Sequence, residues 1–202
     1  MRRLAAIPVL ALGVLAGCGT SEASTVDLDE ALTVELPGFV PAAGRGTPTT
    51  LCDAPPTGTG ATPPSLSGEL GASATVFYEQ AQSTLEAYAW PAASADAARQ
   101  FVDEAASAAQ ECDYELFTDA DTDGDGAIDT GISDVQSVEP WSGSGWEGVR
   151  VHRSVSGQEQ VDRRLVSAGS VVLLVVLRAD RDDPEILAPA DDFLQAVAQS
   201  LE

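Results

Sequence analysis

A run of seven apolar residues, Val171–Leu177, sets the strongest limit on the fold of this chain. β-Branched residues favour strands, and a strand without a polar face must be covered on both sides by other elements. The segment Val161–Val166 precedes this run, and the linker Ser167–Ser170 contains Gly169, which suits a tight turn. We therefore expect a β-hairpin whose second strand lies in the middle of a sheet.

Residues 74–112 predict two more strands and a long helix. Thr75–Glu79 is rich in β-branched and aromatic residues, and Leu85–Trp90 alternates in polarity. Ser94 is a favourable N-cap, so the helix is expected to run from there to about Glu111. Its apolar stripe, at helical spacing, consists of Ala98, Phe101, Val102, Ala105, Ala109 and Cys112.

The rest of the chain completes the sheet and adds one helix. Further strands are predicted at Tyr114–Phe117, Val135–Val138 and Val149–Val155. The C-terminal helix has an apolar face made of Phe193, Leu194, Val197 and Leu201. Because the strands follow one another mainly through hairpins, the predicted fold class is α+β. It is a mostly antiparallel sheet of about five to seven strands, with two helices and one disulfide.

The first eighteen residues predict export. Arg2 and Arg3 form a basic start, Ala5–Leu15 is apolar, and small residues precede Cys18. This order defines a secretory signal, and the apolar run is shorter than the ~20 residues of a spanning helix. Leu15–Cys18 (LAGC) resembles the lipobox of bacterial lipoproteins. The resemblance implies cleavage before Cys18, lipid on its sulfur, and a place on the outer face of the cytoplasmic membrane. An ordinary signal peptide with a chance cysteine is the alternative.

Composition changes along the chain and divides it. Ala54–Gly60 and Thr62–Pro64 are too rich in proline and glycine for regular structure, whereas Ala31–Leu36 has the pattern of one short element. We expect a signal peptide, a lipidated N-terminus with a Pro/Gly/Thr-rich tether, and one α+β domain, at residues 1–17, 18–72 and 73–202.

The cysteines support an extracytoplasmic address. With Cys18 assigned to lipid, Cys52 and Cys112 remain, and two cysteines in an oxidising compartment are expected to pair. A bridge that closes a loop of this length contributes about 4 kcal/mol in the chain-entropy model. It would fasten the tether to the domain. Two free thiols are the alternative.

Charge excludes some partners. The formal net charge is −22, the chain has no lysine, and two arginines leave with the signal. Such acidity argues against nucleic acid and against electrostatic adhesion to anionic lipid, so contact with the membrane must come from the lipid anchor. Solubility and repulsion of other anions are the general interpretation, and cation binding is a sharper one.

The layout from about residue 50 to 202 resembles the extracellular PknH-like sensor domain, found in actinobacterial lipoproteins and outside the membrane span of a Ser/Thr kinase. The resemblance lies in the helix that ends at Glu111-Cys112, the strands that follow, the Gly-turn hairpin and the last short helix. It implies that Cys52 is the partner of Cys112. It also implies ligand sensing or binding in a cleft, with no catalytic residues to carry over.

One loop matches a calcium-binding pattern. Residues 121–129 (DTDGDGAID) fit the first nine positions of an EF-hand loop, in which alternate oxygens point inward and a glycine allows the turn. The ligands would be Asp121, Asp123, Asp125, the carbonyl of Ala127, and Asp129 directly or through water. Position twelve should be a glutamate but is Ile132, and the flanks look like strands. Asp119 or Asp134 could substitute. The alternative is an ordinary acidic turn.

Signs of catalysis are weak. His152 is the only histidine, it lies on the polar face of a strand, and no nucleophile motif such as Gly-x-Ser-x-Gly occurs. Trp141 and Trp146 flank a Gly/Ser turn, where they either form a binding rim or cap the end of a core. We predict a non-enzymatic, lipid-anchored domain that binds or senses an unidentified small ligand. The alternative is a structural or protein-interaction lipoprotein whose partner is an envelope protein.

Overall fold

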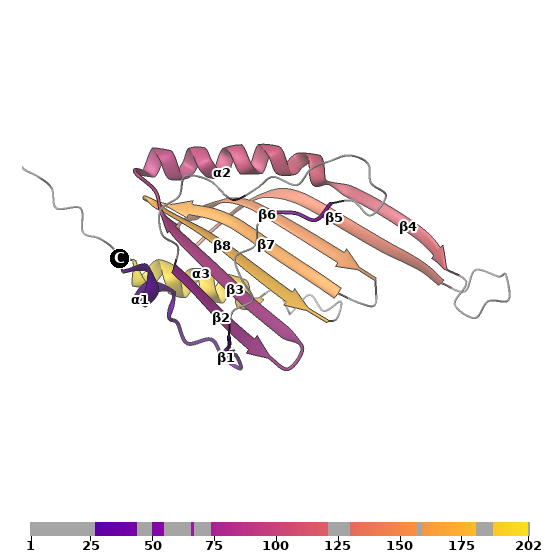
Figure 1. Ribbon diagram of the computed structural model, residues 1–202, viewed down its shortest axis with the longest axis horizontal. Helices are drawn as coiled ribbons and strands as arrows, with labels where there is room; N and C mark the ends of the chain where they lie inside the picture. The colour runs from indigo at the N-terminus through magenta and orange to yellow at the C-terminus, as the bar shows by residue number, and fades with distance from the viewer. Residues whose placement is uncertain are drawn as a thin grey trace, which may run out of the picture.

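The computed structural model describes residues 27–43, 50–54, 66, 74–120, 130–156, 159–180 and 188–201. Its strands form one antiparallel sheet in the order β1-β2-β3-β8-β7-β6-β5-β4 (Figure 1). The elements are α1 (Leu28–Leu32), β1 (Val40–Pro41), β2 (Ala74–Gln80), β3 (Ser83–Pro91), α2 (Ala95–Ala109), a 3₁₀ turn η1 (Gln110–Cys112), β4 (Tyr114–Ala120), β5 (Thr130–Gly143), β6 (Trp146–Val155), β7 (Glu159–Ala168), β8 (Val171–Ala179) and α3 (Ala188–Ser200).

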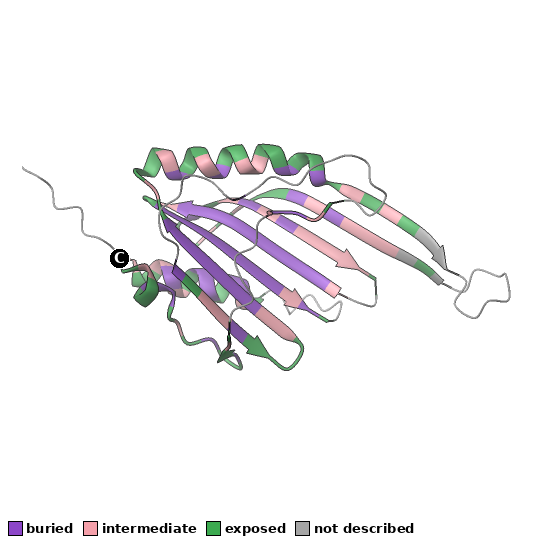
Figure 2. Cartoon of the chain, viewed as in Figure 1, coloured by how far each residue is buried: buried purple, intermediate pink, exposed green. Residues whose placement is uncertain are grey.

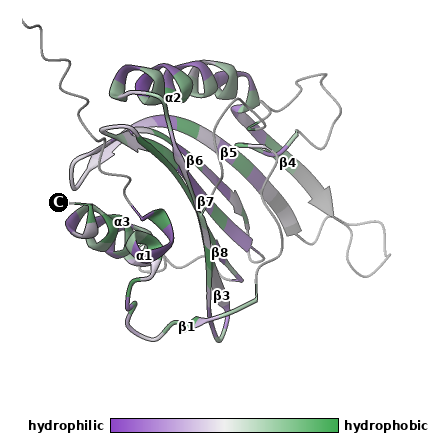
Figure 3. Cartoon of the chain, turned by 60° about the vertical axis from the view of Figure 1, so that its left-hand side comes forward, coloured by the Kyte–Doolittle hydropathy of each residue, from purple (hydrophilic) through white to green (hydrophobic). Residues whose placement is uncertain are grey.

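The sheet is covered on both faces, as the apolar run of β8 requires. Helix α2 lies over one face, here called the α2 face, and α1 and α3 lie over the other, the α3 face (Figure 3). Side chains of β8 alternate between two separate cores: Leu173 and Val175 join Phe193 on the α3 face, whereas Leu174 and Val176 join the core beneath α2. Figure 2 shows the burial concentrated in β3, β8 and β7.

Helix α2 begins and faces the sheet as its sequence predicts. The Ser94 hydroxyl accepts a hydrogen bond from the N–H of Ala97 at 3.1 Å, which satisfies one of the free donors of the first turn. Ala98, Val102 and Ala109 are buried against the sheet, and η1 continues this line to the buried Cys112. The helix therefore delivers Cys112 to the α2-face core.

Residues 27–43 and 50–54, here called the N-terminal arm, lie within the region predicted as tether and contribute to both cores. Leu32 is buried on the α3 face, and Leu51 is buried on the α2 face. The Tyr78 hydroxyl fixes the end of α1, because it donates to the carbonyl of Val34 at 2.8 Å and accepts from the Val34 N–H at 3.1 Å. Strand β1 pairs with β2, so the arm covers that edge of the sheet.

The hairpin turns explain two glycine positions. Ser144 and Gly145, which join β5 to β6, both have positive φ angles of 51° and 81°. Two residues with positive φ make the turn type whose twist matches antiparallel strands, and glycine reaches this conformation without steric cost. Gly169, at φ 54°, plays the same part between β7 and β8. The hairpin predicted there is confirmed, with pairing from Gln160↔Ala179 to Ala168↔Val171.

The strand count differs from the expectation. The described residues form eight strands rather than five to seven, and α1 is a third, one-turn helix. The additions come from the N-terminal arm, where no periodic pattern announces a two-residue strand. Strand β5 also extends beyond the predicted range Val135–Val138 at both ends, and it includes Pro140. Strand β4 pairs only with Thr130–Gln136, so Pro140 lies where one side of β5 is an edge and a missing N–H is tolerated.

Candidate functional site

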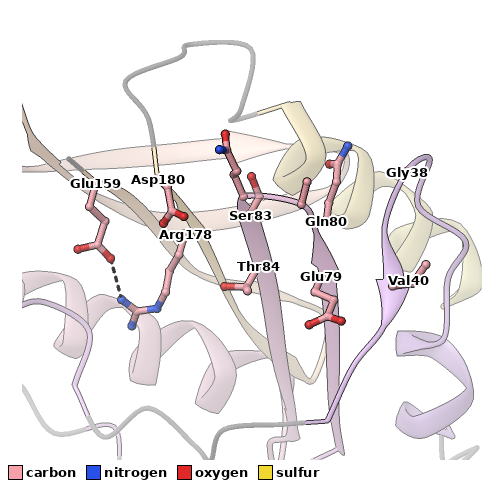
Figure 4. A pocket seen from close by; sticks show the side chains of 11 residues that line it. Gly38, Val40, Glu79, Gln80, Ser83, Thr84, Glu159, Arg178 and Asp180 are labelled. Atoms are coloured by element: carbon pink, nitrogen blue, oxygen red, sulfur yellow. Dashed lines mark ion pairs between the residues drawn. The ribbon is translucent and has the colours of Figure 1, made fainter. Parts of the chain in front are cut away.

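A polar cleft of about 690 Å³ opens at the end of the sheet where β2 turns into β3. One wall is the segment around Gly38 and Val40, and the opposite wall carries Glu159 and Arg178 (Figure 4). Gly38 shapes the first wall, since its φ is +81° and a Cβ there would lie 2.9 Å from Nε2 of Gln80. The other described residues that line the cleft are Glu79, Gln80, Ala81, Gln82, Ser83, Thr84 and Asp180.

The charged groups of this cleft are loosely engaged. Nη1 of Arg178 lies 3.6 Å from Oε1 of Glu159, and the two side chains are 39% and 41% exposed. At this separation and exposure the pair contributes little to stability. Both groups are therefore placed to exchange their mutual contact for contacts with a bound molecule.

Two further polar clusters lie on the faces of the sheet, where four arginines sit on the neighbouring strands β6 and β7. On the α2 face, Arg153 donates from Nε and Nη2 to the two carboxylate oxygens of Asp134, at 3.0 and 2.8 Å. Arg163 donates from Nη2 to both oxygens of Asp53, each at 2.9 Å. The hydrogen bonds from Arg153 lower the pKa of the Asp134 carboxyl, and burial raises the pKa of the nearby Tyr114 hydroxyl.

The α3-face cluster is centred on Asp162, whose side chain is fully buried. Its carboxylate accepts from Nε of Arg164 at 2.8 Å and from Nε of Arg150. Arg164 also binds Asp191 at the start of α3, and its guanidinium lies 4.9 Å from the centre of the Trp141 ring. This cluster ties strand β7 to strand β6 and to helix α3, so its role is one of assembly.

The disulfide predicted from the sequence joins Cys52 to Cys112. It is reinforced by Gln136, which is fully buried. The amide of Gln136 donates to the carbonyl of Cys112 at 2.7 Å and to that of Asp53 at 3.1 Å, and its oxygen accepts from the Asp53 N–H at 3.1 Å. The N-terminal arm is thus held to the α2 face by a covalent bond, by an amide and by the Asp53 carboxylate.

Other predicted site residues lie outside the described residues. These are Cys18 and the calcium-loop residues Asp121, Asp123, Asp125, Ala127 and Asp129. Asp134, named as a substitute ligand, belongs to β5, and its carboxylate is bound by Arg153. Among the residues that the structure describes, no group of three or more His, Cys, Asp or Glu side chains is placed to hold a metal ion.

The single histidine lies in the α3-face cluster. Nδ1 of His152 is 3.8 Å from Oδ1 of Asp162, and strand pairing places Ser137 opposite His152. The Asp162 carboxylate is already bound by two guanidinium groups. In a catalytic triad, a carboxylate orients the imidazole through a hydrogen bond. The Asp162 carboxylate instead binds the two arginines.

The two tryptophans of the β5–β6 hairpin close the α3-face core. Trp146 is 1% exposed, and its Nε1 donates to the carbonyl of Leu194 in α3 at 3.0 Å. Trp141 is half-buried beneath Arg164. The sequence allowed these tryptophans to form either a binding rim or the cap of a core, and their positions match the cap of a core.

Comparisons with known proteins find similarity among solved structures. No family model matches the chain, and no curated protein matches it. Among solved structures, the chain is similar to the crystal structure of the extracellular domain of PknH from Mycobacterium tuberculosis. The identity is 13%, the TM-score is 0.49, and the alignment covers 88% of this chain and 90% of that one. In the described part of this chain, no helix is both long and apolar enough to cross a bilayer.

Proposed function

We propose that this chain is an exported lipoprotein, anchored through Cys18 on the outer face of the membrane, whose domain binds a small molecule outside the cytoplasm. The signal-like residues 1–17 and the lipobox motif support the address. The Cys52–Cys112 disulfide supports it independently, because such bonds persist in oxidising compartments. With those two cysteines paired with each other, Cys18 is left for acylation.

The observation that carries the binding role is the open polar cleft at the β2–β3 end of the sheet. It combines a volume suited to a small molecule with a cation, carboxylates and hydroxyls that are not buried in the core. The ion clusters on the sheet faces, by contrast, have their carboxylates and guanidiniums bound to each other. We therefore assign ligand binding to the cleft, structural roles to the face clusters, and no catalytic role to the domain.

The anchor is tested by metabolic labelling with an alkyne-bearing palmitate, followed by membrane fractionation of cells that produce the full chain. The parent chain is expected to take up label and sediment with membranes. Cys18→Ser is expected to lose both properties, whereas Cys52→Ser/Cys112→Ser, the matched control, is expected to keep the label. Label that survives Cys18→Ser would contradict the proposal.

A second role, contact with an envelope protein, is favoured by one observation. Strand β4 is an edge of the sheet, and its Phe117 is 71% exposed on that strand. Edge strands with an exposed aromatic residue are suited to pairing with another chain. Photo-crosslinking from position 117 in intact cells distinguishes the roles. A discrete protein adduct that persists when Glu79 and Arg178 of the cleft are changed supports the interaction role, and no adduct speaks against it.

A calcium ion at residues 121–129 is proposed from the sequence match alone. Extracellular calcium modules bind with dissociation constants of roughly 10⁻⁴–10⁻³ M. Calorimetry and thermal melting of the full chain in detergent are expected to show calcium binding and a raised melting temperature. Asp123→Ala/Asp125→Ala is expected to remove both effects. If millimolar calcium leaves the parent chain unchanged, the loop is an ordinary acidic turn.

A further inference from the structure

The cleft contains an ordered row of side chains set by strand register. Arg178 of β8 is opposite Thr84 of β3, Thr84 is opposite Glu79 of β2, and Glu79 is opposite Val40 of β1. Residues that are opposite each other in adjacent strands point to the same face, so all four share one side of the sheet. Neighbouring strands lie about 4.8 Å apart, which separates the backbones of Arg178 and Glu79 by about 10 Å.

This row presents four different kinds of contact in sequence. A cation stands at one end, a hydroxyl in the middle, an anion next, and an apolar wall beyond it. Figure 4 shows Arg178 and Glu79 on either side of Thr84. Val40 is 55% exposed, which leaves an apolar surface open beside Glu79. A molecule lying over Thr84 would meet opposite charges at its two ends.

The overall charge of the cleft adds a preference. Among the residues that the structure describes, its lining contains the carboxylates of Glu79, Glu159 and Asp180 and one guanidinium, that of Arg178. A ligand that carried only negative charge would be repelled by three carboxylates, and a ligand with only positive charge would leave Arg178 facing it. A ligand with one carboxylate and one or more ammonium or guanidinium groups satisfies both ends.

We propose that the cleft binds amino acids or short peptides with free termini, and that basic ones bind most tightly. This inference rests on the proposed binding role of the cleft. The ligand carboxylate pairs with Arg178, which can bind it through two parallel N–H···O bonds. The ligand ammonium pairs with Glu79, Thr84 hydrogen-bonds between them, and an additional cationic group is drawn to Glu159 and Asp180.

Calorimetry of the full chain in detergent, with four probes, tests the proposal. L-Arginine carries both charged ends, agmatine is the same molecule without the carboxylate, L-alanine lacks the extra cation, and L-glutamate adds an anion. We expect arginine to bind more tightly than alanine, and agmatine and glutamate to bind at least about tenfold more weakly than arginine. A tenfold change in affinity corresponds to about 1.4 kcal/mol, which the loss of one charge-assisted contact can account for.

Substitutions at Arg178 and Glu79 test which side chain contacts which end of the ligand. Arg178→Gln and Glu79→Gln are each expected to weaken arginine binding at least about tenfold, whereas Arg178→Gln is expected not to weaken the binding of agmatine, which has no carboxylate for Arg178 to bind. Glu104→Gln, which removes an exposed carboxylate from α2 outside the cleft, is the charge-matched control and is expected to bind like the parent. Glu79 is exposed and Arg178 is partly exposed, so the melting temperature without ligand should not change.

The outcomes separate this inference from the binding role on which it rests. Agmatine binding as tight as that of arginine, or arginine binding that survives Arg178→Gln, overturns the amino-acid assignment but leaves a cation-binding cleft. Binding that is unaffected by both cleft variants overturns the cleft as the site. Absence of heat and of a melting shift with all four probes at millimolar concentration overturns the ligand class.

Discussion

The two faces of strands β6 and β7 each carry a pair of arginines, and they use them differently. On the α3 face, Arg150 and Arg164 bind Asp162, which lies on β7 itself, so the central carboxylate is supplied locally. On the α2 face, Arg163 binds Asp53, which arrives from the N-terminal arm 110 residues away in sequence. One cluster fastens neighbouring strands and the other fastens a distant segment.

This difference shows how a buried charge can be satisfied. Asp162 is fully buried, and its geometry follows from strand pairing alone. Asp53 is 34% exposed, and its position depends on Cys52 and Gln136. We expect the first cluster to be intrinsic to the sheet and the second to depend on the disulfide. The four predictions that follow test this distinction.

The largest effect is expected from Asp162→Asn. It leaves two arginines, one of them 2% exposed, without their shared carboxylate. Breaking a buried pair from one side lowers the free energy of unfolding by about 3–5 kcal/mol. Urea denaturation measures the loss. Asp191→Asn, which removes a partner that is 57% exposed, is the control and is expected to cost about 1 kcal/mol or less. Equal losses would refute the central place given to Asp162.

The next effect is expected from Cys52→Ser/Cys112→Ser. The bridge spans 60 residues, and removing it should lower the free energy of unfolding by about 4 kcal/mol in the chain-entropy model. Hydrogen exchange is expected to become faster in residues 50–54 before it does in β7 and β8. Unchanged protection of residues 50–54 would show that the amide and charge contacts hold the arm without the bridge.

A smaller and conditional effect is expected from Asp53→Asn. In the oxidised protein it leaves the buried Arg163 without its carboxylate partner and should cost about 2 kcal/mol. In the background without the disulfide the cost should shrink, because Asp53 is no longer held in place. The cost of Asp162→Asn should stay the same in both backgrounds. A double-mutant cycle that gave no coupling for Asp53 would remove the distinction between the two clusters.

The smallest effect concerns pH and Asp134. Hydrogen bonds from Arg153 lower the pKa of this carboxyl in the folded protein below its ordinary value. A lowered folded pKa gives stability that is present above the unfolded pKa and is lost as pH falls through the folded pKa. The stability difference between parent and Asp134→Asn should therefore be constant above about pH 5 and shrink below about pH 4. A difference independent of pH down to pH 2 would contradict this.

The sequence predicts most of the domain from residue 74 onward, because its elements are announced locally. The Ser94 cap, the stripe of α2 and the Gly169 turn each act within a few residues, and each is confirmed. The arm was harder. Leu51 is buried although it lies among threonine, proline and glycine residues, where no periodicity marks a buried residue. Only long-range packing decides its place.

The candidate site was not predictable in the same way. The row from Arg178 to Glu79 depends on the register of three strands, and β2 is separated from β8 by some ninety residues of sequence. The different roles of the adjacent Arg163 and Arg164 are also not visible in the sequence. Successive residues of a strand point to opposite faces, so the two side chains belong to different clusters. The alternating pattern of β3 was misleading for a related reason. Glu86 is buried like its apolar neighbours, where its carboxylate accepts from the Tyr88 hydroxyl at 2.8 Å.

The way the N-terminal arm wraps the sheet also fixes how the domain would bear a mechanical load. A pull on the N-terminus would first peel α1 from the Tyr78 hydroxyl and then strip the two-residue strand β1 from its edge. The roughly 25 residues up to Cys52 would pay out at most about 90 Å of extended chain. Extension would then stop at the bond to Cys112, and the force would pass into the end of α2 and the strands beside it. The arm is therefore a tether whose extension is limited by the disulfide. The cleft wall at Val40 lies in the part of the arm that would detach before the disulfide bears the force.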